Sequence, residues 1–117
     1  MNKSDINTIM PPYIVYISGK ITGLDIMVAR KNFDYAHKIL EDNGYNAINP
    51  FYFKCTESRL PWIECMEYGL PHLLSADFLC LLSNWEDSIG ARIEYTIHRS
   101  LGEKVMTIHG NYIDILT

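Results

Sequence analysis

Two kinds of hydrophobic pattern alternate along this chain, and their order predicts the architecture. The first is a continuous apolar run with the length of a buried parallel strand, found at 13–17, 45–48, 78–82 and 104–109. The second is an apolar residue at every third or fourth position, as in a helix with one buried face, found at 25–43, 61–75 and 88–101. This β-α-β-α-β-α-β order with short connections predicts a flavodoxin-like three-layer α/β sandwich, in which a parallel sheet carries helices on both faces.

Local signals refine the boundaries of these elements. Asp25 is a favourable N-cap for the first helix, and Asn43-Gly44 is a favourable C-terminal signal. Pro71 lies inside the second helical segment and predicts a kink or restart there, because proline lacks the backbone N–H. Asp77 precedes the strand at 78–82, at its amino end, and is expected to have a structural capping role.

The two ends of the chain complete this picture. Residues 1–11 are polar and are interpreted as a flexible lead-in, and 51–60 form a loop long enough to reach over a site. Residues 112–116 form either a short edge strand or a docked tail. We therefore expect residues 1–117 to form a single domain.

The loops after the first and third strands are the expected ligand site. Ligands of open α/β sheets bind at the carboxyl ends of the strands, which places Ser18–Gly23 and Ser83–Gly90 together. Ser88 or Asp87 can cap the helix that follows, and Gly90 lets a ligand approach its first turn. Free N–H groups and the helix dipole favour an anion at such a position.

Glu94 is the candidate catalytic group of that helix. An apolar stripe, which we expect to be buried, recurs every four residues: Ile89, Ile93, Ile97 and Leu101. Glu94 is rotated by ~100° from Ile93 and is therefore expected to lie off this stripe. Two interpretations remain open, namely a carboxylate held over the strand ends or a solvated glutamate on an amphipathic helix.

Composition and charge exclude several classes of protein. A net charge of −4 without a Lys/Arg cluster argues against binding to a nucleic-acid polymer. Cys55, Cys65 and Cys80 form an odd set without a CxxC pair, so we expect neither disulfides nor a metal site, and no cofactor is indicated. No apolar run reaches the ~20 residues of a membrane span, and residues 1–11 lack the features of a signal peptide. We expect a soluble, cytoplasmic protein.

Several segments together resemble a known superfamily. These are YISGKITG, INPF and LLSADFLCLLSNWEDSIGARIEYTIHRSLG, and they span roughly residues 13–109. They resemble the nucleoside 2-deoxyribosyltransferase-like proteins, in particular a branch of small phage and bacterial domains related to 2′-deoxynucleoside 5′-monophosphate N-glycosidases. The active members cleave or exchange the N-glycosidic bond, so the resemblance implies a nucleoside 5′-monophosphate or related nucleotide as ligand.

The resemblance also implies roles for individual residues. Glu94 corresponds to the nucleophile that attacks the anomeric carbon, and Tyr16 to a tyrosine that orients it. Ser88 corresponds to a phosphate-binding serine where nucleoside transferases have aspartate, which favours a 5′-nucleotide. The remaining positions in the loops that bind sugar and phosphate are Ser18, Gly19, Lys20 and Gly90. Lys20 replaces the usual proline and adds a positive charge.

One position departs from the family pattern. Members usually carry an aspartate at the position of Gly69, where it contacts the sugar and assists the leaving base. Glu67 lies two positions away and points to another face, whereas His72 is either a partial substitute or a surface residue. Trp85 either walls a base pocket or packs in the core. Arg92 either touches a phosphate or forms surface ion pairs.

Three functions follow as hypotheses. The first is hydrolysis of the N-glycosidic bond of a (deoxy)nucleoside 5′-monophosphate by a glutamate nucleophile. The alternatives are a non-catalytic nucleotide-binding protein of phage or prophage origin, and a nucleoside deoxyribosyltransferase. We also expect a homodimer, or a dimer of dimers, formed by the helices at 61–75 and 88–101. The candidate interface residues are Trp62, Met66, Tyr68, Leu70 and Tyr95.

Overall fold

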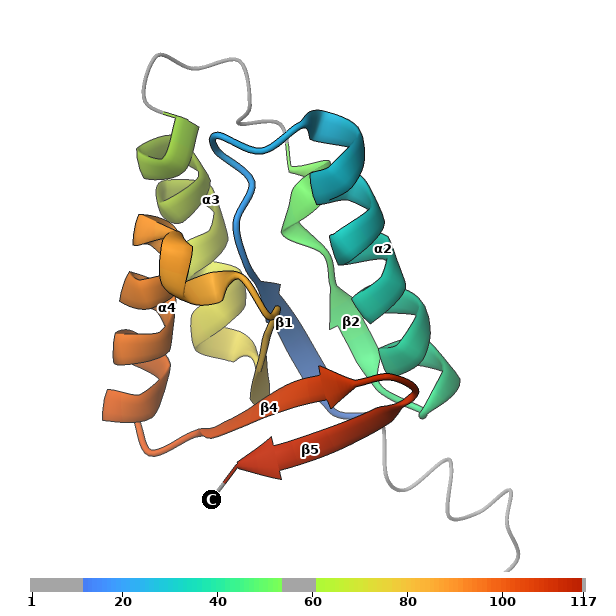
Figure 1. Cartoon of the computed structure of the whole chain (residues 1–117). Coiled ribbons are helices and arrows are strands. Elements are labelled where there is room, and N and C mark those ends of the chain that lie inside the picture. The colour runs from blue at the N-terminus through green and yellow to red at the C-terminus, as the bar shows by residue number, and fades with distance from the viewer. Residues whose placement is uncertain (1–11, 54–60, 117) are drawn as a thin grey trace, which may run out of the picture.

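A computed structural model describes residues 12–53 and 61–116 of the chain (Figure 1). The expected lead-in at 1–11 and most of the expected loop at 51–60 lie outside the described residues. The elements in chain order are β1 (Ile14–Ser18), α2 (Ile26–Asp42), β2 (Asn46–Ile48), the 3₁₀ turn η1 (Pro50–Tyr52), α3 (Pro61–Ser75), β3 (Phe78–Leu81), the 3₁₀ turn η2 (Trp85–Asp87), α4 (Ile89–Ser100), β4 (Lys104–His109) and β5 (Tyr112–Leu116).

The sheet has five strands in the order β2-β1-β3-β4-β5. The pairs formed by β1 with β2, β1 with β3, and β3 with β4 are parallel, as the alternating pattern predicts. Residues 112–116 form the edge strand that was one of the two expectations for them, and this strand, β5, pairs with β4 in the antiparallel direction, so the sheet is mixed and not purely parallel. Only residues 110 and 111 connect these two strands, and a parallel return requires a much longer crossover. Gly110 has φ +60°, as a tight hairpin turn requires.

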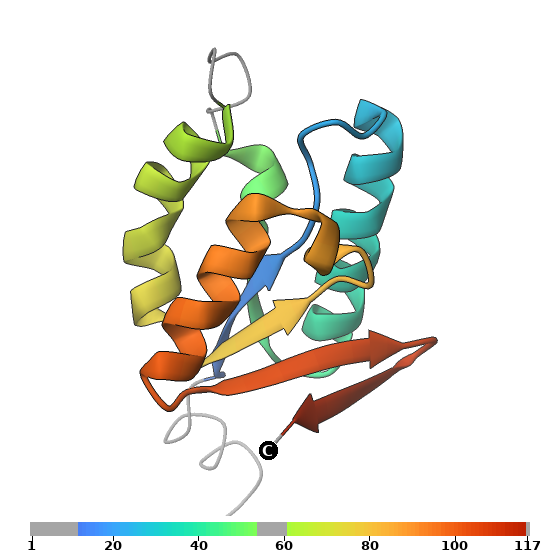
Figure 2. The same cartoon turned by 60° about the vertical axis from the view of Figure 1, so that its left-hand side comes forward.

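Helices lie on both faces of the sheet (Figures 1 and 2). Helix α2 covers one face, and α3 and α4 lie beside each other on the other. Alternate residues of β1 divide between the two cores, because successive side chains of a strand point in opposite directions. Val15 and Ile17 pack with Phe33 of α2, whereas Tyr16 packs with Leu73 of α3.

The signals at the ends of the elements act largely as expected. The Asp25 carboxylate accepts hydrogen bonds from the N–H groups of Met27 and Val28, and Gly44 after α2 has φ +87°. Asp77 has the expected structural role, since its carboxylate accepts a 2.8 Å hydrogen bond from the N–H of Ile14. No helix among the described residues is long and apolar enough to cross a membrane.

Helix α3 does not restart at Pro71. It runs without interruption from Pro61 to Ser75, with the proline inside it. The last turn holds because Leu73, fully buried, packs with Ala76 and Leu79 against the sheet. Tertiary burial thus outweighs the backbone hydrogen bond that proline removes.

The buried face of helix α4 differs from the face that the isoleucine spacing predicts. Ile89 and Ile93 are 49% and 37% exposed, and Leu101 is 54% exposed. The buried residues of α4 are Ala91, Glu94 and His98. Glu94 is only 7% exposed, so the expectation that it lies off the buried face is wrong, and so is the alternative of a solvated glutamate.

Most of the residues expected to form a dimer interface pack against other residues of the same chain. Met66 is buried, Leu70 belongs to the core against the sheet, and Tyr95 packs on Trp85 with ring centroids 4.8 Å apart. Tyr68 is exposed. The side chain of Trp62 lies outside the described residues. The apolar surface that α4 leaves open is instead a shallow groove around Ile89, Ile93 and Ile97.

Candidate active site

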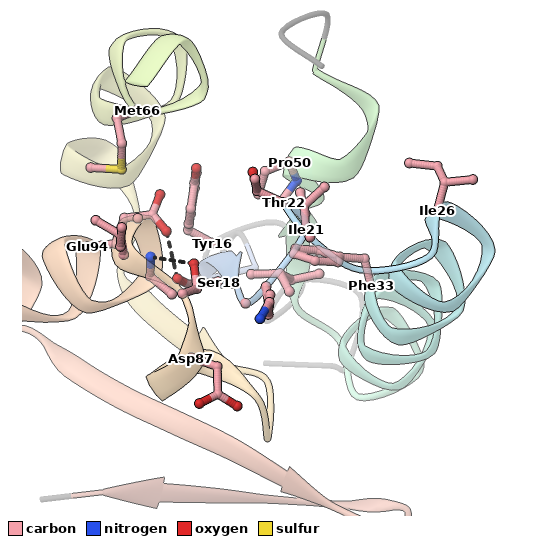
Figure 3. Close-up of a pocket in the computed structure, with 18 residues that line it drawn as sticks. Tyr16, Ser18, Ile21, Thr22, Ile26, Phe33, Pro50, Met66, Asp87 and Glu94 are labelled. Carbon is pink, nitrogen blue, oxygen red and sulfur yellow. Dashed lines mark hydrogen bonds between the residues drawn. The ribbon is translucent and has the colours of Figure 1, made fainter. Parts of the chain in front are cut away.

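A cavity of about 390 Å³ lies at the carboxyl ends of β1 and β3 (Figure 3). These neighbouring strands lead into helices on opposite faces of the sheet, β1 into α2 and β3 into α4, so a crevice opens between their ends. Its size is that of a small-molecule site. The cavity is lined by the expected loop Ser18–Gly23 and by residues 87–90 of the expected loop Ser83–Gly90, together with residues from α2, η1, α3 and α4.

Glu94 and two hydroxyl groups of β1 form the polar centre of the cavity. Ser18 Oγ donates a hydrogen bond of 2.6 Å to Glu94 Oε1. The hydroxyl of Tyr16 lies near the same carboxylate and acts on its pKa as a hydrogen-bond donor. Both donors are 1% exposed. Figure 3 shows the three side chains together on one side of the cavity, opposite Ile26 and Phe33.

Burial sets the protonation of this cluster. It raises the pKa of Glu94 to about 7, although the hydrogen bonds from Ser18 and Tyr16 favour the carboxylate and lower the pKa. Burial, followed by the charge of Glu94, raises the pKa of Tyr16 far above its usual value. Tyr16 therefore stays protonated as a hydrogen-bond donor, while Glu94 exchanges its proton near neutral pH.

The start of α4 forms a second polar part of the cavity. Ser88, and not Asp87, caps the helix, because Ser88 Oγ accepts a 3.1 Å hydrogen bond from the N–H of Ala91. The Ser88 hydroxyl keeps its own proton for donation to a ligand. Gly90 also lines the cavity, and the N–H groups of a first helical turn have no carbonyl partner within the helix. This end can therefore bind an anion.

The loop after β1 is held against the loop after β3. The N–H of Lys20 donates a 3.0 Å hydrogen bond to Asn84 Oδ1. A Cβ built on Gly19 would lie 2.5–2.8 Å from side-chain atoms of Leu82, so only glycine permits this approach. Gly19 and Lys20 both line the cavity, as expected for ligand-contacting positions. Asp87 also lines it and is exposed, and in Figure 3 it points away from Glu94.

The opposite wall of the cavity is apolar. It is formed by Ile21, Ile26, Phe33 and Pro50, while Met66 of α3 adds an apolar side chain on the side of Glu94 (Figure 3). Such a surface suits a flat ring more than a charged group.

Hydrogen bonds fix the segment that carries Pro50. The Asn49 side chain accepts from the N–H of Phe51 at 3.1 Å, and its amide nitrogen lies 3.3 Å from Asp34 Oδ1 of α2. This connection holds the end of β2 beside α2 and thereby positions the apolar wall.

Three of the candidate residues lie away from the cavity. His72 is exposed and stacks with Phe53, their ring centroids 5.4 Å apart. Trp85 packs on Tyr95 and is therefore a core residue and not a base-pocket wall. Arg92 is exposed on the outer side of α4. None of the three lines the cavity, which agrees with the alternatives of a surface position for His72 and Arg92 and of core packing for Trp85.

Ser18 has a role that sequence reasoning missed. It was expected to contact substrate, whereas the structure makes it a hydrogen-bond donor to Glu94. The signal was present in the strand period, since residues 16 and 18 of a strand share a face. Tyr16 and Ser18 therefore reach the same partner on α4.

The side chains that commonly bind metals are not clustered in the part of the chain that the structure describes. No group of three or more His, Cys, Asp or Glu residues there is placed to hold an ion. Burial raises the pKa of the Cys80 thiol to about 12, so this cysteine is protonated at neutral pH. The polar centre of the cavity is the buried Glu94 carboxyl group with the hydroxyls of Ser18 and Tyr16, while Asp87 and Ser88 lie elsewhere on its lining.

Residues 13–107 match a protein family described as a domain of unknown function, DUF4406. The chain belongs to this family. The match includes β1, α4 and every residue that lines the cavity. No curated protein and no solved structure matches the chain. The family description names no activity, so the cavity is the basis for the proposed function.

Proposed function

We propose that the protein hydrolyses the N-glycosidic bond of a (deoxy)nucleoside 5′-monophosphate with Glu94 as nucleophile. One observation carries the proposal: Glu94 is buried in a cavity of ligand size, where it accepts a hydrogen bond from Ser18 and lies near the Tyr16 hydroxyl. The two donors orient the carboxylate. The resemblance to nucleoside 2-deoxyribosyltransferase-like proteins, which assigns this role to Glu94, supports the same chemistry.

The reaction has two steps. A Glu94 oxygen forms a bond to the anomeric carbon as the carbon–nitrogen bond breaks, and the base leaves with the electron pair and takes a proton from solvent. The negative carboxylate stabilises the oxocarbenium-like transition state. Water then attacks the anomeric carbon of the glycosyl ester, loses a proton and releases the sugar phosphate and the Glu94 carboxylate.

The remainder of the cavity suits the other parts of such a substrate. The start of α4, with the Ser88 hydroxyl and Lys20 nearby in the cavity lining, offers donors to a phosphate. The apolar wall opposite Glu94 offers a surface to the base. The exposed carboxylate of Asp87 on the same lining opposes a dianion, so binding depends on the N–H and hydroxyl donors and not on net charge.

The strand order supports a finer assignment of the fold. The order 2-1-3-4-5, with helices on both faces, favours the flavodoxin-like three-layer type, whose ligands bind at the same switch point. An antiparallel edge strand such as β5 is common on otherwise parallel sheets. We propose this type as part of the same hypothesis.

A panel of nucleoside 5′-monophosphates tests the function. The protein is incubated with each nucleotide, and free base is measured by chromatography. We expect release from at least one nucleotide and its loss in Glu94→Gln. Glu64→Gln, which changes an exposed glutamate of α3, is the matched control. Mass spectrometry should find a sugar phosphate attached to Glu94 after rapid denaturation. Release that persists in Glu94→Gln would refute the mechanism.

A specific observation favours one alternative, a nucleotide-binding protein without turnover. Glu94 is the only buried carboxyl group among the described residues, and Gly69 offers no second one. Protonation of a leaving base is then left to solvent, which slows the reaction. Calorimetry distinguishes the alternative: binding of a 5′-monophosphate without any release of base would favour it.

A further inference from the structure

Gly69 of α3 lies against the end of the Tyr16 side chain. A Cβ built at position 69 would overlap the Tyr16 hydroxyl oxygen, while its next neighbours, Phe53 Cε2 at 3.4 Å and Tyr16 Cζ at 3.5 Å, lie at ordinary contact distances. The conflict therefore concerns one atom, the tyrosine oxygen. Gly69 is itself buried within α3, a position where glycine costs helix stability relative to alanine.

The tyrosine ring and backbone are held by their neighbours, while the side chain borders the cavity. Tyr16 is 1% exposed, its ring packs against Phe53 with centroids 6.5 Å apart, and its backbone is held between β2 and β3. Its hydroxyl also lies near the Glu94 carboxylate and favours its charged form. Any side chain at position 69 must therefore displace the hydroxyl group that contacts Glu94.

We propose that Gly69 is a positioning residue, whose missing side chain leaves the space in which the Tyr16 hydroxyl reaches the Glu94 carboxylate. Tyr16 thus brings a neutral donor, and not a second acid, to this side of the site. The significance for catalysis rests on the proposed role of Glu94, whereas the positioning itself does not. The absence of a side chain at position 69 is then part of how the site is built.

Two substitutions, alone and together, test the proposal without any substrate. Gly69→Ala adds only the Cβ, and Tyr16→Phe removes only the oxygen with which that Cβ collides. The Glu94 carboxyl signal is followed by carbon NMR during a pH titration and assigned by its absence in Glu94→Gln. Because the tyrosine hydrogen bond favours the carboxylate, its loss raises the titration midpoint.

We expect Gly69→Ala to raise the Glu94 midpoint by about one pH unit, the worth of a hydrogen bond to a charged group. Tyr16→Phe should give a similar increase, and adding Gly69→Ala to it should change nothing more. Ser18→Ala removes the other donor and is the matched control. Its effect should add to that of Gly69→Ala, because the two act on different hydrogen bonds.

Stability provides a second measurement. Gly69→Ala should lower the unfolding midpoint in the natural background, and be neutral or favourable once Tyr16→Phe has removed the oxygen. If Gly69→Ala alone fails to fold, folding of the double variant supports the proposal. An unchanged Glu94 titration in Gly69→Ala, an equal shift with and without the tyrosine oxygen, or a double variant that also fails to fold would overturn it. Absence of glycosidase activity would refute the proposed function and leave these results unaffected.

Discussion

Replacement of Glu94 by glutamine should change how the stability of the protein depends on pH. Burial raises the pKa of Glu94 from 4.5 to about 7 in the folded protein. A raised folded pKa means that the folded state holds its proton more tightly than the unfolded state. The stability that Glu94 contributes is therefore fully present below pH 4.5 and is lost as the pH rises through about 7.

The size of the effect follows from the two pKa values. Between them, each pH unit removes about 1.4 kcal/mol from the free energy of unfolding. From pH 5 to pH 8 the loss due to Glu94 is about 2–3 kcal/mol. Glutamine has a similar shape and no charge, so Glu94→Gln escapes this loss. Its cost from imperfect hydrogen bonds to Ser18 and Tyr16 is the same at both pH values and cancels in the comparison.

Urea denaturation of both proteins at pH 5 and pH 8 measures the difference. We expect the stability of Glu94→Gln, relative to the natural protein, to be more favourable at pH 8 by about 2–3 kcal/mol. Contributions from other groups, such as His98, occur in both proteins and cancel. Parallel pH profiles of the two proteins would refute this prediction, because they would show that Glu94 is not held in a desolvated site.

Further predictions concern the phosphate end, a buried histidine and assembly. Ser88→Ala should reduce the preference for a 5′-monophosphate over its nucleoside by about tenfold or more, and remove about 1 kcal/mol of helix capping; calorimetry and urea denaturation measure these. Burial lowers the pKa of His98, so stability should fall as the pH drops below about 6.5, and His98→Leu should flatten that decline in denaturation experiments. The chain should form a homodimer through the exposed groove of α4, and Ile93→Glu should reduce the mass found by light scattering to 13.5 kDa. A natural protein already at 13.5 kDa would contradict dimerisation.

The sequence by itself was sufficient to predict where the cavity lies. The apolar runs of β1 and β3 and the loops after them are local features, and parallel strands bring their carboxyl ends to one edge. The N-cap Asp25 and the turn glycine Gly44 depend on neighbouring residues only, so they too were predicted. The antiparallel direction of β5 was left open, although the two-residue connection before it decides the matter.

Only the tertiary structure decided which face of α4 is buried. Periodicity detects a helix, but burial depends on what the neighbouring elements offer. Here the sheet offers the hydroxyls of Tyr16 and Ser18, and these make a buried carboxylate tolerable at Glu94, while Ile93 is left at the surface. Ser18 and Glu94 are 76 residues apart, and no local pattern connects them. The same holds for Gly69, because a Cβ at this position would overlap the hydroxyl oxygen of Tyr16, which lies on a strand distant in the sequence.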